Sequence, residues 1–310
     1  MSESVGERQE FPAEKHEILK SAVAVLFEKA TKKRMESLEK PGHAWGIGAN
    51  EATIDSDSMQ EFVSKIEDFT LEDLQLAIEL FEAFWLEWDP SLRFILQAIL
   101  FELRWLLKKK QSKDGMVDPY EGLDPRDVWN AFSGARAGFE PEDKDGKKQT
   151  DYWDTFRICM EDNGIDSQLR DRRVIELGCG ESILFRDYCV KNEASEYVGV
   201  DLFRAKPSDQ LIATTRVITV GQDAWKYLSE QPANSAIIAE YMFLRGEMVS
   251  KIPGRNRVEV RTLARAIAEQ IYRVQIPGLN VLTFSSHNIF EEEFLRAGFK
   301  KDTDRDLFVK

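Results

Sequence analysis

The chain has 310 residues, and 43% of them are hydrophobic, which suffices for the cores of one large domain or two smaller ones. Its 42 basic and 55 acidic residues leave a net charge of -13. A field of that sign repels phosphate backbones, so a nucleic-acid partner is not expected. The three cysteines lack a CxxC spacing and indicate neither a disulfide framework nor a metal site.

No segment has the pattern of a secretion signal or a membrane span. The N-terminal residues MSESVGERQEF lack an apolar run. The most apolar stretch, Leu92 to Leu107, is short and is interrupted by charged side chains. We therefore expect a cytoplasmic protein without membrane association.

Residues 1–140 are predicted to form an all-helical N-terminal domain. Apolar residues recur at helical spacing over about 14–39, from Leu74 to Trp85 and from Leu92 to Leu106. This domain carries no motif with a chemical meaning. A lid, a substrate-binding region and a dimer interface all stay open for it.

Two of these helices have recognisable start signals. Thr70 and Asp73 resemble a capping box, and Asp89-Pro90 supplies a cap and a proline suited to a first helical turn. Upstream of them, residues 42–57 are Gly-rich and aperiodic, which predicts a loop or a mobile lid.

Regular patterning weakens from Val117 to Thr150, and the hydrophilic tract 140–148 predicts a domain boundary or an exposed loop. Several side chains in irregular stretches suit a lid, with plain packing as the alternative for each. These are Trp45, Trp129, Phe132 and Arg136.

Residues 150–310 are predicted to form an α/β domain. Apolar runs typical of strands alternate with helical stretches, among them 261–273 and 289–297. This alternation predicts a mostly parallel sheet with helices on both faces. The predicted strands are 174–177, 197–200, 217–220, 235–239 and 280–284.

The first two predicted strands end in residues suited to ligand binding. The first strand runs directly into Gly178-Cys179-Gly180, and glycines in a strand-to-helix turn let a ligand approach the backbone. Twenty-one residues after Gly180 the second strand ends in Asp201, an acid placed to accept hydrogen bonds from both ribose hydroxyls. Because open α/β sheets bind ligands at the carboxyl ends of their strands, these residues predict a nucleoside site.

Two common nucleotide motifs are absent. A dinucleotide fingerprint that starts at Gly178 needs glycine or alanine at position 183, where the sequence has Ile183. A GxxxxGK[ST] phosphate loop is missing as well. The site is therefore predicted to hold a ribose without a pyrophosphate.

The C-terminal sequence resembles the class I S-adenosylmethionine-dependent methyltransferases. VIELGCGES at 174–182 is similar to the family's first motif, with Ser182 in place of the third glycine, and YVGVD at 197–201 is similar to its second strand. GQDAW at 221–225 and SAIIAEY at 235–241 resemble the segment after the third strand and the fourth strand.

The resemblance covers about Tyr152 to Lys310. It implies a Rossmann-like, seven-stranded methyltransferase sheet with helices on both faces, closed by an antiparallel hairpin from residues 299–310. Pro207 departs from the pattern, because a helix is normally expected there.

The resemblance further implies S-adenosylmethionine as the cofactor and a role for each matching residue. Gly178, Cys179 and Gly180 line its methionine portion, and Glu176 orients its amino group. A tight turn with a capping acid is the alternative for this segment.

Asp201 is placed by the resemblance at the ribose and Asp223 at the adenine, and their neighbours Leu202 and Ala224 are expected among the cofactor-binding residues. An alternative for Asp223 is to cap a helix that begins at Ala224. Glu240 ends the fourth strand, which in the family lies beside the methyl group.

The implied reaction is an in-line displacement, which needs alignment and exclusion of water, and a general base only if the acceptor must lose a proton. Expected acceptor-side residues follow the fourth and fifth strands: Glu240, Tyr241, Arg245 and His287. A helix cap is the alternative for His287, and packing or a surface position is the alternative for Tyr241 and Arg245. We expect a small-molecule acceptor with an oxygen, nitrogen or sulfur nucleophile, and the acidic charge suits a cationic or zwitterionic metabolite.

Two other functions stay open. The same sheet serves aminopropyl transfer from decarboxylated S-adenosylmethionine, in which an acidic pair positions a polyamine, although Glu240 has no adjacent aspartate. The second is a non-catalytic cofactor-binding scaffold that recruits a protein partner. The sequence leaves the acceptor atom and the oligomeric state open, a homodimer included.

Overall fold

The computed structural model divides the chain into two compact units, Met1–Val117 and Asp118–Lys310. The division lies upstream of the tract 140–148, so residues 118–133 belong with the C-terminal unit. The structure describes residues 11–38, 56–84, 93–120, 122–133, 157–158, 160–162, 164–180, 183–203, 206–240, 257–283, 288–302 and 307–310.

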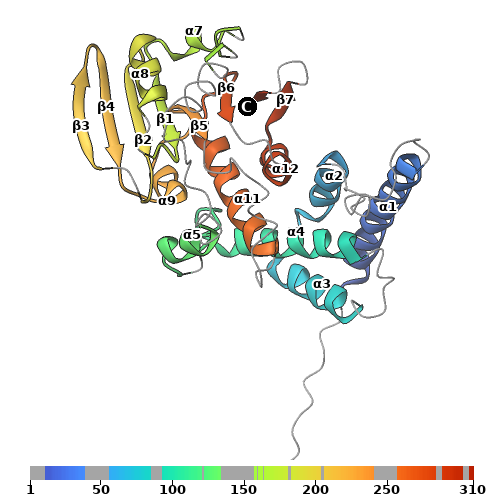
Figure 1. The fold of residues 1–310 in the computed structure, drawn as a ribbon. Coiled ribbons are helices and arrows are strands. Elements are labelled where there is room, and N and C mark those ends of the chain that lie inside the picture. Colours follow the sequence, from blue (N-terminus) through green and yellow to red (C-terminus); the bar gives the residue numbers. More distant parts are fainter. Residues whose placement is uncertain are drawn as a thin grey trace, which may run out of the picture. The chain divides into compact units, whose positions relative to one another are not determined.

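The described part of the N-terminal unit is built from helices (Figure 1). The three predicted helices are confirmed as α1, α3 and α4, and their apolar faces meet in one core that includes Leu26, Leu74 and Ile99. The helices of this unit are α1 (Ala13–Leu38), α2 (Ser56–Ile66), α3 (Leu71–Phe84) and α4 (Arg93–Gln111).

Helix α2 corrects the interpretation of its region. The loop expected over 42–57 ends earlier, because α2 begins at Ser56, while residues 42–55 lie outside the described residues. Met59, Phe62 and Ile66 of α2 are buried. Residues three and four apart share one face of a helix, so this face packs into the core.

The predicted capping box at the start of α3 is confirmed. The backbone amide of Asp73 donates to Thr70 Oγ1 at 3.1 Å, and the amide of Thr70 donates to Asp73 Oδ2 at 2.9 Å. These two bonds satisfy amide groups that have no partner inside the helix.

The C-terminal unit contains a mixed eight-stranded sheet in the order β3-β4-β2-β1-β5-β6-β8-β7. The five predicted strands are confirmed as the parallel strands β4, β2, β1, β5 and β6, and the predicted C-terminal hairpin is β7 and β8. The expected seven strands are corrected to eight, because strand β3, antiparallel to β4, was not predicted. The strands are β1 (Arg173–Leu177), β2 (Glu196–Val200), β3 (Ser208–Ile212), β4 (Thr215–Val220), β5 (Ile237–Glu240), β6 (Asn280–Thr283), β7 (Lys300–Asp302) and β8 (Leu307–Val309).

Helices cover both faces of this sheet (Figure 1). Side chains alternate between the faces of a strand, so Val174 packs in the core with α8, whereas Ile175 packs in the core with α9, α11 and α12. The predicted helices 261–273 and 289–297 are confirmed in α11 and α12. The helices of this unit are α5 (Pro125–Ser133), α7 (Asp166–Leu169), α8 (Leu184–Lys191), α9 (Ala224–Ser229), α11 (Arg257–Val274) and α12 (Asn288–Ala297).

Helix α5 corrects a second interpretation. Trp129 and Phe132 were assigned to irregular stretches but lie in this helix. Asp124 accepts a hydrogen bond from the amide of Arg126 at 2.8 Å. Pro125 occupies the first helical position, where its missing N–H would have had no partner inside the helix. The other two side chains suggested for a lid, at positions 45 and 136, lie outside the described residues.

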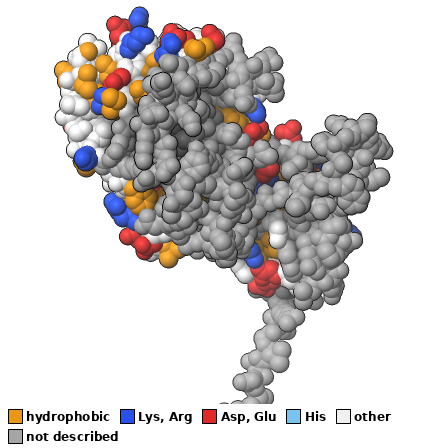
Figure 2. Space-filling view, viewed as in Figure 1, with side chains coloured by type: hydrophobic (Ala, Val, Ile, Leu, Met, Phe, Trp, Pro, Cys, Tyr) orange, Lys and Arg blue, Asp and Glu red, His pale blue; other side chains and the backbone are white. Residues whose placement is uncertain are grey.

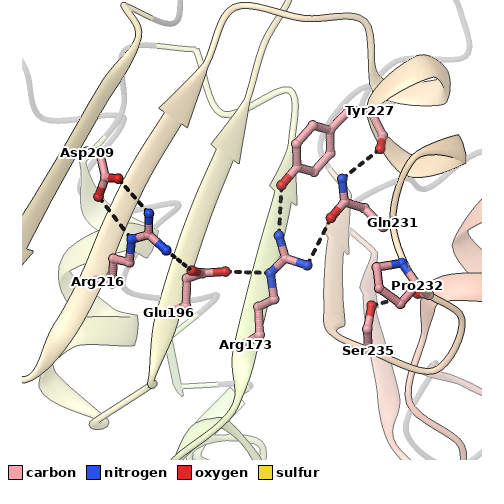
Figure 3. A network of polar contacts seen from close by, with 8 residues as sticks. All are labelled: Arg173, Glu196, Asp209, Arg216, Tyr227, Gln231, Pro232 and Ser235. Carbon is pink, nitrogen blue, oxygen red and sulfur yellow. Dashed lines mark hydrogen bonds and ion pairs between the residues drawn. The ribbon is translucent and has the colours of Figure 1, made fainter.

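A polar network crosses the amino-terminal ends of the central strands (Figure 3). Arg173 of β1 pairs with Glu196 of β2 at 2.5 Å, and another of its nitrogens donates to the Tyr227 hydroxyl at 3.0 Å. Arg216 of β4 pairs with Glu196 at 3.4 Å and with Asp209 of β3 at 2.7 Å. The network therefore joins four neighbouring strands and α9.

A buried ion cluster joins α11 and α12. Glu293 of α12 has no exposed side-chain surface and pairs with Arg261 at 2.7 Å and Arg265 at 2.6 Å. Burial by itself raises the pKa of Glu293, but the guanidinium groups of Arg265, Arg261 and Arg296 bring it below its usual value. Glu293 is therefore ionised where α11 and α12 meet.

The surface carries both signs of charge. Among the coloured side chains of the face shown in Figure 2, basic and acidic ones of the C-terminal unit lie near one another. Among the described helices, none combines the length and the apolar character needed to cross a membrane.

Candidate functional site

The strand order changes direction between β1 and β5. From β1 the chain continues to β2 and β4 on one side and later returns to β5 and β6 on the other. Leu177 at the end of β1 is in register with Val200 of β2 and Glu240 of β5, and Val200 is in register with Val220 of β4. The carboxyl ends of four strands therefore share one edge, and open α/β sheets bind ligands at such a reversal.

Glycines shape the turn that follows β1. Gly178 has φ 77 and Gly180 has φ 58, a left-handed conformation that other residues adopt at a steric cost. The amide of Gly178 donates to Val200 O at 2.7 Å, which ties the turn to β2. Cys179 between them is buried, and burial raises the pKa of its thiol, so this thiol stays protonated.

Asp201 lies beside this turn, as the sequence predicted for an acid at the end of β2. The amide of Gly180 donates to Asp201 Oδ2 at 3.1 Å, and the amide of Phe203 donates to Oδ1 at 2.9 Å. Asp201 and its neighbour Leu202 are half-buried. The two backbone bonds fix the carboxylate at the sheet edge, and each oxygen of a carboxylate can accept more than one hydrogen bond.

Glu176 lies at the same edge but is buried. The Tyr197 hydroxyl donates to its carboxylate, and burial raises the pKa of Glu176 to about 7. Gly199 leaves the space for this contact, because a Cβ there would lie 3.0 Å from the Tyr197 hydroxyl and 2.9 Å from Cys179 Sγ. Sequence reasoning missed Tyr197, although a tyrosine on a buried strand usually has a polar partner for its hydroxyl.

Asp223 follows β4 and does cap α9, since its Oδ1 accepts the amide of Lys226 at 3.0 Å. Its Oδ2 also accepts hydrogen bonds from the Tyr120 hydroxyl at 2.5 Å and from Trp129 Nε1 at 3.0 Å. Asp223 and Ala224 are buried at this edge. Tyr120 had no sequence signal, because it lies in a stretch without apolar periodicity.

The acceptor side of the predicted site is described only in part. Glu240 ends β5 and has no exposed surface. Tyr241, Arg245 and His287 lie outside the described residues. The residues brought together at the edge are therefore those predicted for the cofactor.

The edge offers two kinds of recognition. The left-handed glycine turn has no Cβ that would keep a ligand from the backbone, and several acids stand at the ends of adjacent strands: Glu176, Asp201, Asp223 and Glu240. Ionised acids can accept hydrogen bonds from hydroxyl and amino groups. Comparison of the sequence with protein-family models and with curated proteins found no match.

Proposed function

We propose that the C-terminal unit binds S-adenosylmethionine at the carboxyl edge of its sheet and promotes methyl transfer to a small-molecule acceptor. The observation that carries this proposal is the 3.1 Å hydrogen bond from the Gly180 amide to Asp201 Oδ2. It joins the glycine turn after β1 to the acid after β2, the two parts of the nucleoside signature.

The sheet supports the proposal. Without the edge strand β3, seven strands remain, and they end in the antiparallel pair β7 and β8. The methyltransferase resemblance implies seven strands that end in an antiparallel hairpin, and the presence of such a set within the eight-stranded sheet supports the proposal. The reversal of strand order between β1 and β5 lies beside the proposed cofactor residues.

The residues of the chain would bind and orient the cofactor. Gly178 and Gly180 would let the methionine portion approach the backbone, Asp201 would accept the ribose hydroxyls, and Glu240 would lie on the acceptor side. The bound cofactor would supply an activated methyl group. The remaining work of the protein is alignment and exclusion of water.

Calorimetric titration with S-adenosylmethionine and with S-adenosylhomocysteine tests the binding claim. Asp201→Ala is expected to weaken binding about tenfold or more, because hydrogen bonds to a charged group are lost. The matched control is Asp209→Ala, which removes an exposed carboxylate of the same unit in the amino-terminal network. The proposal fails if the unaltered chain binds neither compound, or if the two variants weaken binding equally.

The reaction is tested with a cofactor labelled in its methyl group and a panel of cationic and zwitterionic small molecules. Label in one of these acceptors supports methyl transfer. Binding without transfer to any acceptor would favour the scaffold function. Tighter binding of the decarboxylated cofactor would favour aminopropyl transfer.

A further inference from the structure

Three hydrogen bonds converge on the side chain of Asp223. The Tyr120 hydroxyl and Trp129 Nε1 both donate to Oδ2, at 2.5 and 3.0 Å, and the Lys226 amide donates to Oδ1 at 3.0 Å. Asp223 is 2% exposed and Tyr120 is 4% exposed. Because water competes little at such a place, the bonds hold the carboxylate firmly.

Only one of these three hydrogen bonds is required to cap α9. The Lys226 amide alone provides the cap of α9, whereas Tyr120 and Trp129 lie 103 and 94 residues away in the sequence. Burial and the nearby Asp223 raise the pKa of the Tyr120 hydroxyl, so it remains a donor. Trp129 Nε1 also lies 3.1 Å from the Tyr120 oxygen, which fixes both donors on one side of Asp223.

Oδ1 of Asp223 can accept one further hydrogen bond. A carboxylate oxygen accepts about two hydrogen bonds, and Oδ1 accepts one, from Lys226. A ligand N–H can take the second place, but a ligand carbonyl cannot, since two acceptors would then face each other in a buried site. At the same ring position, adenine presents an amino group and hypoxanthine presents a carbonyl oxygen.

We infer that Tyr120 and Trp129 are positioning residues, which orient Asp223 so that the site prefers a purine with an exocyclic amino group. The inference rests on the proposed function and assigns both residues an action through Asp223, without contact to the ligand. It gives the segment 118–133 a role in selecting the base.

The test compares the affinities of S-adenosylhomocysteine and S-inosylhomocysteine for the full chain by calorimetry. The unaltered chain is expected to prefer the adenosyl compound by about 100-fold or more. Tyr120→Phe and Trp129→Phe each remove one donor and are expected to lower that ratio about tenfold. Tyr227→Phe is the matched control, because its hydroxyl bonds to Arg173 in the amino-terminal network, and it should leave the ratio unchanged.

Asp223→Asn gives a second test that does not remove an aromatic ring. Tyr120 and Trp129 would draw the asparagine oxygen toward them and leave the amide nitrogen in place of Oδ1, so the Lys226 amide would lose its acceptor and α9 its side-chain cap. This variant is expected to prefer the inosyl compound.

The outcomes separate the inference from the function on which it rests. No binding of either compound by the unaltered chain would overturn the proposed function. Equal affinity for both compounds, or a preference that survives in both aromatic variants, would overturn the inference and leave cofactor binding intact.

Discussion

Glu176 is a buried acid whose ionised form the fold disfavours. Burial raises its pKa from 4.5 to about 7, and the hydrogen bond from Tyr197 opposes that rise. Between these pH values the folded chain holds a proton that the unfolded chain has released. The stability from this proton is complete below pH 4.5 and is lost as the pH rises toward 7.

Glu176→Gln tests this coupling, because glutamine stays neutral throughout. Over the interval from pH 4.5 to 7, the free energy of unfolding of the unaltered chain should fall by about 3 kcal/mol relative to the variant. Urea unfolding at a series of pH values measures the difference. In Tyr197→Phe the free energy of unfolding should continue to fall up to a higher pH, because the variant lacks the hydrogen bond that lowers the pKa of Glu176. Parallel curves for the unaltered chain and Glu176→Gln would disprove the coupling.

At the residue scale, the sequence located the glycine turn and the acids but not what holds them. Gly178 and Asp201 stand at the ends of strongly apolar strands, and parallel strands bring such ends to one edge. The contact from Tyr197 to Glu176 depends on strand register, and the contact from Tyr120 to Asp223 spans 103 residues. Neither contact leaves a local pattern in the sequence.

At the scale of elements, the apolar pattern located the parallel strands and the helices α1, α3, α4, α11 and α12. It did not locate the short helices α2 and α5, of 11 and 9 residues, although both have an apolar face. Strand β3 has no apolar pattern: Leu211 is 72% exposed, and the turn to β4 uses Ala213, at φ 51, without the glycine or asparagine that marks such turns. Helix α5 did carry a signal, since Asp124-Pro125 has the same sequence pattern as Asp89-Pro90, the predicted helix start that lies outside the described residues.

The capping box of α3 is expected to contribute measurably to the free energy of unfolding. Thr70→Ala removes the oxygen that accepts the Asp73 amide and is expected to lower the free energy of unfolding by about 1 kcal/mol. Urea unfolding followed by circular dichroism measures it. Thr70→Ser keeps the hydroxyl and should retain most of that stability. An equal loss in both variants would mean that the cap is not the cause.

At the scale of the whole molecule, the sheet of the C-terminal unit has two differently built edges. Its carboxyl edge carries the proposed site, and its amino edge carries the network around Arg173 and Glu196. Both side chains are largely buried, at 25% and 20% exposed. Loss of one partner therefore leaves a partly desolvated charge, which costs more than loss of a surface pair.

Glu196→Gln is expected to lower the free energy of unfolding by about 1–2 kcal/mol and to leave the affinity for S-adenosylhomocysteine unchanged. Asp209→Asn alters the exposed end of the same network, so a smaller loss is expected there. Urea unfolding and calorimetry on the same samples measure both quantities. The account of two separate edges would be wrong if Glu196→Gln weakened ligand binding as strongly as Asp201→Ala.

The long span between Tyr120 and Asp223 also matters while the chain is being made. At a synthesis rate of about 5–20 residues per second, Tyr120 emerges from the ribosome about 5–20 s before Asp223. During that interval the Tyr120 hydroxyl and Trp129 Nε1 lack the carboxylate that accepts their hydrogen bonds in the folded chain. The hydrogen bonds to the Asp223 side chain are thus completed late in translation, after the residues of β4 have been made.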